Sequence, residues 1–277
     1  MAWTERQRRM LAEMGLPPWL APAAAPDEPT DAPAPEPAAQ PAAPSPTQPQ
    51  AAAPVVPAPA PQAQVAPMGA PANRPAGAVA MLDWTGLRDA VAACTACGLC
   101  ESRTQTVFGV GNRSAEWMIV GEAPGEQEDR QGEPFVGRSG QLLDNMLLAL
   151  GLSRAEGAAD RQVYIANTLK CRPPGNRNPT ADELARCEPF LVRQIELIKP
   201  RIILAMGRFA VQSLLRSNEP IGRLRGRVHH YQGVPLVVTY HPAYLLRNPL
   251  DKARAWDDLC LAAETAAAAA AAAPAPG

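Results

Sequence analysis

Short apolar runs alternate with segments of helical periodicity along the second half of the chain. Four runs rich in β-branched and aliphatic side chains are predicted strands, at residues 117–120, 163–166, 201–205 and 235–240. Amphipathic helices are predicted in the same region, at residues 141–150, 181–198 and 207–215. A run at residues 228–231 is predicted to pair with the fourth strand as a hairpin. This alternation predicts a three-layer α/β/α sandwich with a central, mostly parallel four-stranded sheet.

The pattern disappears between residues 21 and 80, where 17 of the chain's 32 prolines lie. Alanine, glutamine and proline bury too little apolar surface to offset the entropy of ordering the chain, so this segment is predicted to be a disordered Pro/Ala-rich extension. The alanine-rich tail, residues 263–277, is expected to be disordered as well. Residues 81–262 are left as one folded domain, which is enough for a single core.

Residues 1–20 contain a capping-box pattern at Thr4 and Gln7 and a glycine at Gly15, which predict a short helix over residues 5–14. This helix could dock onto a protein partner, or it could be an idle terminus. The first residues lack an apolar signal region, so the expected location is the bacterial cytoplasm. No stretch of 18 strongly apolar residues occurs, so no membrane association is expected, and we expect a monomer.

Polar residues follow the predicted strands at the points where the strands end. Glu122 comes directly after Gly121 at the end of the first strand, Asn167 ends the second, and His241 follows the fourth. Ligands of parallel α/β sheets bind at the carboxyl ends of the strands. These residues therefore predict a site at that edge of the sheet.

Five cysteines are candidates for a metal site. Cys94, Cys97 and Cys100 are closely spaced, whereas Cys171 and Cys187 lie at the end of the second strand and inside the next helix. Four thiolates suit either a tetrahedral zinc ion or a [4Fe–4S] cluster, and five buried free thiols remain an alternative. Spacing alone does not identify the spare cysteine. Cys260 stands apart and is expected to pack as a small apolar side chain.

Charge becomes informative when it is counted by region. The whole chain has a net charge of −1, but residues 201–254 hold nine basic and two acidic side chains. A solvated basic face would account for this excess, and so would a surface that faces the phosphates of a nucleic acid.

Five motifs occur in order between residues 82 and 261: Gly121-Glu-Ala-Pro-Gly-Glu-Gln-Glu-Asp129, Gly132-Glu-Pro-Phe-Val-Gly137, Asn167-Thr-Leu-Lys-Cys-Arg-Pro-Pro174, Cys187 and His241-Pro-Ala-Tyr-Leu-Leu-Arg-Asn-Pro249. Together they resemble the motifs of the family 4 uracil-DNA glycosylases. The resemblance implies a DNA repair enzyme that flips uracil out of single- or double-stranded DNA and hydrolyses the N-glycosidic bond, leaving an abasic site.

The resemblance also implies a [4Fe–4S] cluster with a structural role, which makes zinc the minor alternative. Its implied ligands are Cys94, Cys97, Cys171 and Cys187, and Cys100 would be a bystander.

For the base pocket, the resemblance implies that Phe135 stacks on uracil and that Asn167 reads its N3–H and O4 edge. His241 would donate to O2 of the departing uracil and stabilise its negative charge. Gly121 and Ala123 would line the pocket, and Ala123 stands where the best-known uracil glycosylases have an aspartate.

Catalysis also calls for a carboxylate and for contacts to DNA. Glu128 is expected to position water or stabilise positive charge on the sugar, and Glu122 to shape the pocket. Leu246 and Arg247 are expected to act as a wedge and a groove contact in a loop. The basic residues Arg223 and Arg225 are expected to contact phosphates.

Two other hypotheses about the function remain compatible with the sequence. The chain could be a non-catalytic or covalently trapping uracil-DNA binder of the same superfamily, although the loop after Cys171 has no histidine to form such an adduct. It could also be a metal-stabilised nucleic-acid-binding module.

Overall fold

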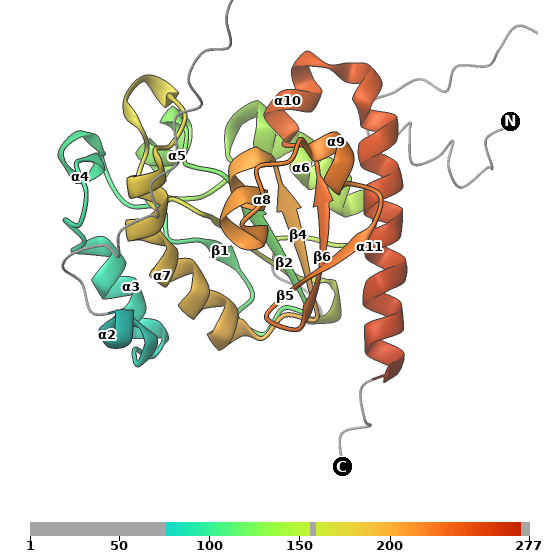
Figure 1. The fold of residues 1–277 in the computed structure, drawn as a ribbon, viewed down its shortest axis with the longest axis horizontal. Coiled ribbons are helices and arrows are strands. Elements are labelled where there is room, and N and C mark those ends of the chain that lie inside the picture. The colour runs from blue at the N-terminus through green and yellow to red at the C-terminus, as the bar shows by residue number, and fades with distance from the viewer. Residues whose placement is uncertain (1–75, 156–158, 273–277) are drawn as a thin grey trace, which may run out of the picture. The chain divides into compact units, whose positions relative to one another are not determined.

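Six strands form one mixed sheet in the computed structural model, which describes residues 76–155 and 159–272 (Figure 1). The strands lie in the order β1-β3-β2-β4-β6-β5. Their bounds are β1 Val110–Gly111, β2 Trp117–Gly121, β3 Val163–Asn167, β4 Ile202–Met206, β5 Val228–Tyr231 and β6 Val234–Thr239. The predicted helix at residues 5–14 and the predicted linker up to residue 75 lie outside the described residues.

The four central strands are parallel, so their carboxyl ends meet at one edge of the sheet. Gly121 at the end of β2 is opposite Asn167 at the end of β3, and Met206 at the end of β4 is opposite Thr239 at the end of β6. The edge strands β1 and β5 are antiparallel to their neighbours. Every residue of β2, β3 and β4 is buried, as expected for strands covered on both faces.

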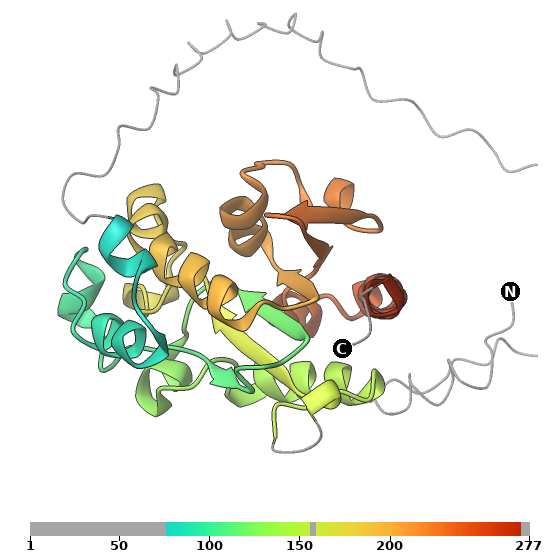
Figure 2. The same cartoon turned by 90° about the horizontal axis from the view of Figure 1, so that it is seen from below.

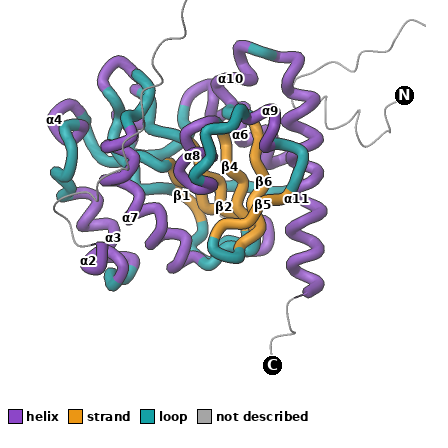
Figure 3. The backbone as a smooth tube through the Cα atoms, in the orientation of Figure 1, coloured by secondary structure: helices purple, strands orange, loops and turns teal. Residues whose placement is uncertain are grey.

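Helices cover both faces of the sheet, which gives the three layers (Figures 2 and 3). One face packs against three helices through a core that includes Ile119, Leu143 and Trp256. These helices are α6 Gly137–Ala149, α10 Pro242–Arg247 and α11 Lys252–Ala272. The other face packs, through residues such as Met118 and Ile195, against α7 Ala181–Ile198, α8 Arg208–Leu215 and α9 Ile221–Leu224.

A smaller core lies where the first helices pack against α7. It contains Leu87, Leu99, Phe190, Cys171 and Cys187. The helices that supply it are α2 Ala76–Ala80, α3 Trp84–Ala92 and α4 Leu99–Ser102. The remaining elements are α5 Glu126–Gln131 and three short 3₁₀ helices, Ala159–Arg161, Pro174–Asn176 and Pro249–Asp251.

The predicted α/β/α sandwich and its parallel four-stranded centre are confirmed, but the sheet is larger than predicted. The hairpin arm β5 joins the sheet as an edge strand, and β1 adds a second edge. β1 has only two residues, too few to produce a recognisable pattern of alternation.

Regular secondary structure extends beyond both predicted domain boundaries, residues 81 and 262. α2 lies inside the predicted linker, and its Val79 is buried in the small core. α11 runs ten residues past position 262, because its buried residues Trp256 and Leu259 anchor the helix and the following alanines have the highest helix propensity. No helix in the described ranges is both long enough and apolar enough to cross a membrane.

Candidate active site

A cleft of about 1220 Å³ opens at the carboxyl ends of the parallel strands. Each of the four central strands contributes to its wall, through Glu122 after β2, Asn167 in β3, Gly207 after β4 and His241 after β6. Small-molecule pockets usually measure about 300–1,000 Å³, so this cleft can hold a nucleotide together with part of its backbone. The predicted site residues at the strand ends are therefore brought together.

Asn167 and Phe135 converge on Gly121 at the floor of the cleft. A Cβ atom at position 121 would overlap both the Asn167 Oδ1 atom and the Phe135 ring. Only glycine therefore lets the amide and the aromatic ring approach the end of β2. Backbone hydrogen bonds hold the ends of β2 and β3 together, because the N–H groups of Thr168 and Leu169 donate to the carbonyls of Gly121 (3.0 Å) and Glu122 (3.1 Å).

The Asn167 side chain is 2% exposed, and its Oδ1 atom accepts no hydrogen bond. A buried amide oxygen without a partner costs about 1–3 kcal/mol, so such a group points to a ligand that completes it. The carboxamide can accept from one group and donate to another at the same time. This is the pairing that the N3–H and O4 edge of uracil needs.

Phe135 is held in a strained backbone conformation. Its φ is +54°, in the left-handed region that a bulky residue adopts at a cost of order 1–3 kcal/mol. Its ring is stacked against His241, with 5.2 Å between ring centroids and an interplanar angle of 27°. This backbone conformation places the aromatic ring beside Asn167 and His241, in a position to contact a base in the cleft.

His241 caps the start of α10 and presents a neutral imidazole to the cleft. Its Nδ1 atom accepts a hydrogen bond from the Ala243 N–H (3.2 Å), which assigns the ring proton to Nε2. Burial, with a smaller effect of the Arg247 charge, lowers the pKa of His241 to about 4. The Nε2–H is therefore a neutral donor at physiological pH.

Glu128, which sequence reasoning favoured as the catalytic carboxylate, has both of its oxygens bonded to the backbone. Oε2 accepts from the Gly125 N–H (3.1 Å) and Oε1 from the Val136 N–H (3.0 Å). The first bond caps the backbone at the start of α5, and the second fixes the loop that carries Phe135. Glu128 therefore holds the cleft wall in shape, a role that the prediction had given to Glu122.

Glu122 is the carboxylate of the cleft with the most perturbed titration. Burial raises its pKa to about 7, and the Arg208 charge opposes this rise. No hydrogen bond to its carboxylate is found within the described residues. A side chain that titrates near neutral pH and is not engaged by the backbone has the properties of a catalytic base.

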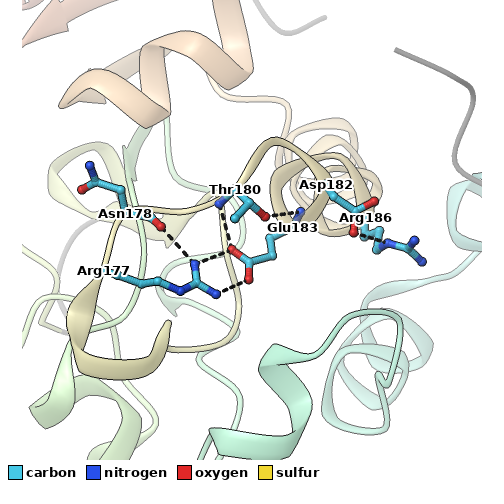
Figure 4. Close-up of polar contacts among 6 residues, drawn as sticks. All are labelled: Arg177, Asn178, Thr180, Asp182, Glu183 and Arg186. Atoms are coloured by element: carbon cyan, nitrogen blue, oxygen red, sulfur yellow. Dashed lines mark hydrogen bonds and ion pairs between the residues drawn. The ribbon is translucent and has the colours of Figure 1, made fainter.

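The loop after β3 is anchored at the start of α7 by Arg177 and Glu183 (Figure 4). The Arg177 guanidinium donates to both carboxylate oxygens, at 2.6 and 2.9 Å, and Thr180 completes a capping box with Glu183. The hydrogen bond from Arg177 is the main cause that lowers the pKa of Glu183 to about 2. Arg177 and Asn178 line the cleft, so this clamp fixes one of its walls.

Three arginines that line the cleft, Arg138, Arg208 and Arg247, form no ion pair within the described residues. Only Arg247 was predicted. Arg138 and Arg208 each lie in the first turn of a helix, where a preceding or initial glycine turns the chain toward the cleft. An arginine directly after a glycine at the start of a predicted helix is the sequence feature that could have identified both residues.

The predicted phosphate contacts Arg223 and Arg225 differ from each other. Arg223 is exposed on α9, beside the cleft residues Ile221 and Gly222. Arg225 is mostly buried, and its Nε atom donates to the fully buried Asp258 (3.0 Å). The Arg225 charge is therefore neutralised inside the protein, and a contact of Arg225 with DNA stays a prediction.

The surroundings of Leu246, the predicted wedge, also differ from the expectation. Leu246 is part of helix α10 and not of a loop, and it packs partly buried against the main core. Its neighbour Leu245 is fully inside that core. Neither leucine stands free of the surface, because the helical turn that begins at His241 directs both toward the sheet.

Five cysteines line a second, small cavity beside the cleft. They are Cys94, Cys97, Cys100, Cys171 and Cys187. Within the described residues, no group of three or more Cys, His, Asp or Glu side chains is arranged to hold a single metal ion. Cys260 lies elsewhere and packs partly buried against the main core.

Cationic groups surround these thiols. Arg103 Nη1 donates to Cys171 Sγ (3.1 Å), and the backbone N–H of Lys170 donates to Cys187 Sγ (3.2 Å). The buried Lys170 ammonium also donates to the Asn167 carbonyl (2.8 Å) and to Gln194 (2.7 Å). Lys170 therefore joins the thiol cavity to the strand end that carries Asn167.

Comparison with known proteins gives a consistent result. Residues 108–260 match the Uracil DNA glycosylase superfamily. The chain is 44% identical over 167 residues to the Type-4 uracil-DNA glycosylase of Archaeoglobus fulgidus, covering 57% of this chain and 81% of the relative. It is also 44% identical to the Type-4 enzymes of Saccharolobus solfataricus (59% and 77% covered) and Thermotoga maritima (58% and 82% covered).

Proposed function

This chain belongs to the type-4 enzymes of the uracil-DNA glycosylase superfamily and releases uracil from DNA, and from that premise we propose how its cleft performs the reaction. The observation that carries the proposal is the buried Asn167 Oδ1 atom without a partner. We assign this atom to the N3–H of an extruded uracil, and the Asn167 amide N–H to O4. Cytosine presents the inverted pattern of donor and acceptor at this edge and would be rejected.

Phe135 and His241 complete the base pocket in this proposal. Phe135 provides the aromatic surface for the base, and its strained backbone is held by the Glu128 bond to the next residue. The His241 Nε2–H donates to uracil O2 as negative charge develops on the leaving base. Because the donor is already oriented by the Nδ1 bond, it stabilises the transition state without reorganising.

We assign the catalytic carboxylate to Glu122 in place of Glu128. Glycosidic cleavage produces positive charge on the sugar, and a nearby carboxylate can stabilise that charge and accept a proton from the attacking water. Glu122 lines the cleft next to Gly121 and carries a pKa near 7. Gly121 and Ala123 leave room beside it for the sugar.

DNA would bind along the rim of the cleft through Arg138, Arg208 and Arg247. These unpaired guanidinium groups can contact the phosphates that flank the extruded nucleotide. Arg223 extends this positive rim along α9.

The five thiols support a [4Fe–4S] cluster held by Cys94, Cys97, Cys171 and Cys187, with Cys100 as a bystander. Such a cluster is larger than a single ion, so its ligands are spread around a cavity, and N–H···S bonds such as those from Arg103 and Lys170 suit bound thiolates. The cluster would supply a structural cross-link between the first helices, β3 and α7. The base-release chemistry needs no redox step from it.

Iron content and visible absorbance test the cluster. Purified protein is expected to contain iron and absorb broadly in the visible range. Cys187→Ala should lose both signals, whereas Cys100→Ala should keep them. Stoichiometric zinc without iron, or loss of iron in Cys100→Ala alone, would overturn the ligand assignment.

Replacing the Asn167 amide tests the base pocket. Asn167→Ala should lower uracil release about 100-fold or more, since it removes hydrogen bonds made to the reacting base. The matched control is Asn145→Ala, an exposed asparagine on α6, which should leave the rate unchanged. Circular dichroism would verify that both variants fold. Equal rates in the two variants would show that another residue reads the base.

A further inference from the structure

The loop that carries Phe135 is held by residues that lie outside the cleft as well as by residues that line it. Phe135 has a φ of +54°, in the left-handed region, and its ring lines the cleft. Because each peptide unit is planar, the orientations of the two units that flank a residue define its φ and ψ angles. Contacts that hold both units therefore decide whether Phe135 keeps this unfavourable conformation.

Arg154 holds the peptide unit that precedes Phe135. Its Nη1 atom donates to the Pro134 carbonyl (2.9 Å), and its Nε atom donates to Asp144 Oδ1 (2.7 Å) in α6. The Arg154 side chain is only 16% exposed, and none of these three residues lines the cleft. Asp144 is about half exposed, and such an ion pair contributes little to stability. The contact with a structural consequence is therefore the hydrogen bond to Pro134, which fastens the loop to α6 from behind the pocket wall.

The peptide unit that follows Phe135 is held from two sides. Its N–H, which belongs to Val136, donates to Glu128 Oε1 (3.0 Å). Its carbonyl lies against Gly140 in the first turn of α6, so closely that a Cβ atom at position 140 would overlap it. With Arg154 on the preceding unit, neither backbone dihedral of Phe135 can relax without breaking one of these contacts.

We propose that Arg154 is a positioning residue that sets the Phe135 ring for stacking on the extruded base. Without the bond to Pro134, Phe135 would return to a more favourable backbone region, and its ring would leave its place beside Asn167. The cleft would then lose a preorganised surface, so it would bind the extruded base more weakly. The inference rests on the proposed stacking of Phe135 on uracil and adds a residue that does not touch the base.

A double-mutant cycle tests whether Arg154 acts through the Phe135 ring. Uracil release is measured for the wild type, Arg154→Ala, Phe135→Ala and the double variant. Arg154→Ala should lower kcat/KM about tenfold when the ring is present, a loss comparable to that of a stacking contact. In the Phe135→Ala background the same substitution should change kcat/KM by less than about twofold, because the ring it positions is gone. A merely structural role would lower both values by the same factor.

Two further variants keep the test independent of misfolding. Arg201→Ala is the matched control, because Arg201 pairs with Glu116 (3.0 Å) away from the cleft, and it should release uracil at the wild-type rate. Arg154→Lys keeps the charge but replaces the planar fork by a single nitrogen, so its rate should lie between those of the wild type and Arg154→Ala. Circular dichroism would verify that each variant folds.

A binding measurement provides a readout that does not depend on cleavage. An oligonucleotide with 2′-fluoro-2′-deoxyuridine resists cleavage, because the fluorine disfavours positive charge on the sugar. Arg154→Ala should raise its Kd about tenfold and leave the Kd for the same strand with thymine unchanged, since the stacking contact is lost and the phosphate contacts remain.

Equal losses of kcat/KM in both backgrounds, wild-type rates in both Arg154 variants, or an unchanged Kd for the fluorinated strand would overturn the role of Arg154. A Phe135→Ala variant as active as the wild type would instead contradict the proposed stacking of Phe135, and this inference with it. The two failures are therefore distinguishable.

Discussion

At the scale of single residues, the cleft carboxylates Glu122 and Glu128 differ in their surroundings. Within the described residues the Glu122 carboxylate accepts no hydrogen bond from the backbone, and burial raises its pKa to about 7. Glu128 accepts from two backbone N–H groups and fixes the loop that carries Phe135. The first can therefore act on water and sugar, and the second shapes the pocket.

This division predicts a pH dependence. If the ionised form of Glu122 is active, kcat/KM for uracil release should fall as the pH drops through about 7. Glu122→Gln should be slower at pH 8 and should lack this step. Because the pKa of Glu122 is raised in the folded protein, its contribution to stability is lost as pH rises from about 4.5 through 7, so Glu122→Gln should melt higher at pH 8.

Glu128→Gln is the comparison variant. It should melt lower, because an amide keeps one of the two acceptor oxygens, and it should retain the step near pH 7. A variant series in which Glu128→Gln loses the step and Glu122→Gln keeps it would contradict the assignment.

The sequence could predict the positions of Asn167 and His241, because both follow recognisable strands whose carboxyl ends meet. It could not distinguish Glu122 from Glu128. That distinction depends on where the loop from Gly125 to Val136 directs its N–H groups, and on the burial of Glu122 beneath neighbours distant in sequence.

At the scale of elements, Arg225 shows why a count of charges misleads. It joins the segment after α9 to Asp258 in α11, 33 residues away, and its guanidinium lies over the Tyr240 ring at 5.8 Å. The Gly226 N–H donates to the same carboxylate (3.1 Å). The sequence pattern predicts the helices and strands, but it contains no signal for which arginine finds a buried partner.

Arg225→Ala should therefore destabilise the fold. It leaves the fully buried Asp258 without its cation, which costs about 3–5 kcal/mol in the free energy of unfolding. The neighbouring exposed Arg223→Ala should change stability by less than about 0.5 kcal/mol and reduce the salt dependence of DNA binding. Urea unfolding and DNA titrations at several salt concentrations measure both. Unchanged stability of Arg225→Ala would show that the ion pair is not formed.

At the scale of the whole molecule, the cleft and the thiol cavity share one segment. Asn167 ends β3, Lys170 donates to its carbonyl, and Cys171 follows in the wall of the second cavity. The proposed cluster would thus fix the strand end that carries Asn167. Residue types and spacing predicted this set of cysteines, whereas the link through Lys170 depends on tertiary packing that spacing does not reveal.

The limits of the folded part were the least predictable feature. Alanine-rich sequence surrounds the domain on both sides, and its composition alone does not tell a packed helix from an unpacked segment. Val79 and Trp256 make the difference between the two, because each packs an otherwise alanine-rich helix against a core.

The central claim is that the cleft hydrolyses the glycosidic bond of uracil repeatedly and does not capture uracil-containing DNA once. The direct measurement incubates the full chain with an excess of uracil-containing duplex and counts abasic sites per protein molecule. We predict many abasic sites per molecule, with free uracil released in equal number. A count that stops at one per molecule with a stable protein–DNA adduct, or binding without any abasic site, would contradict the account.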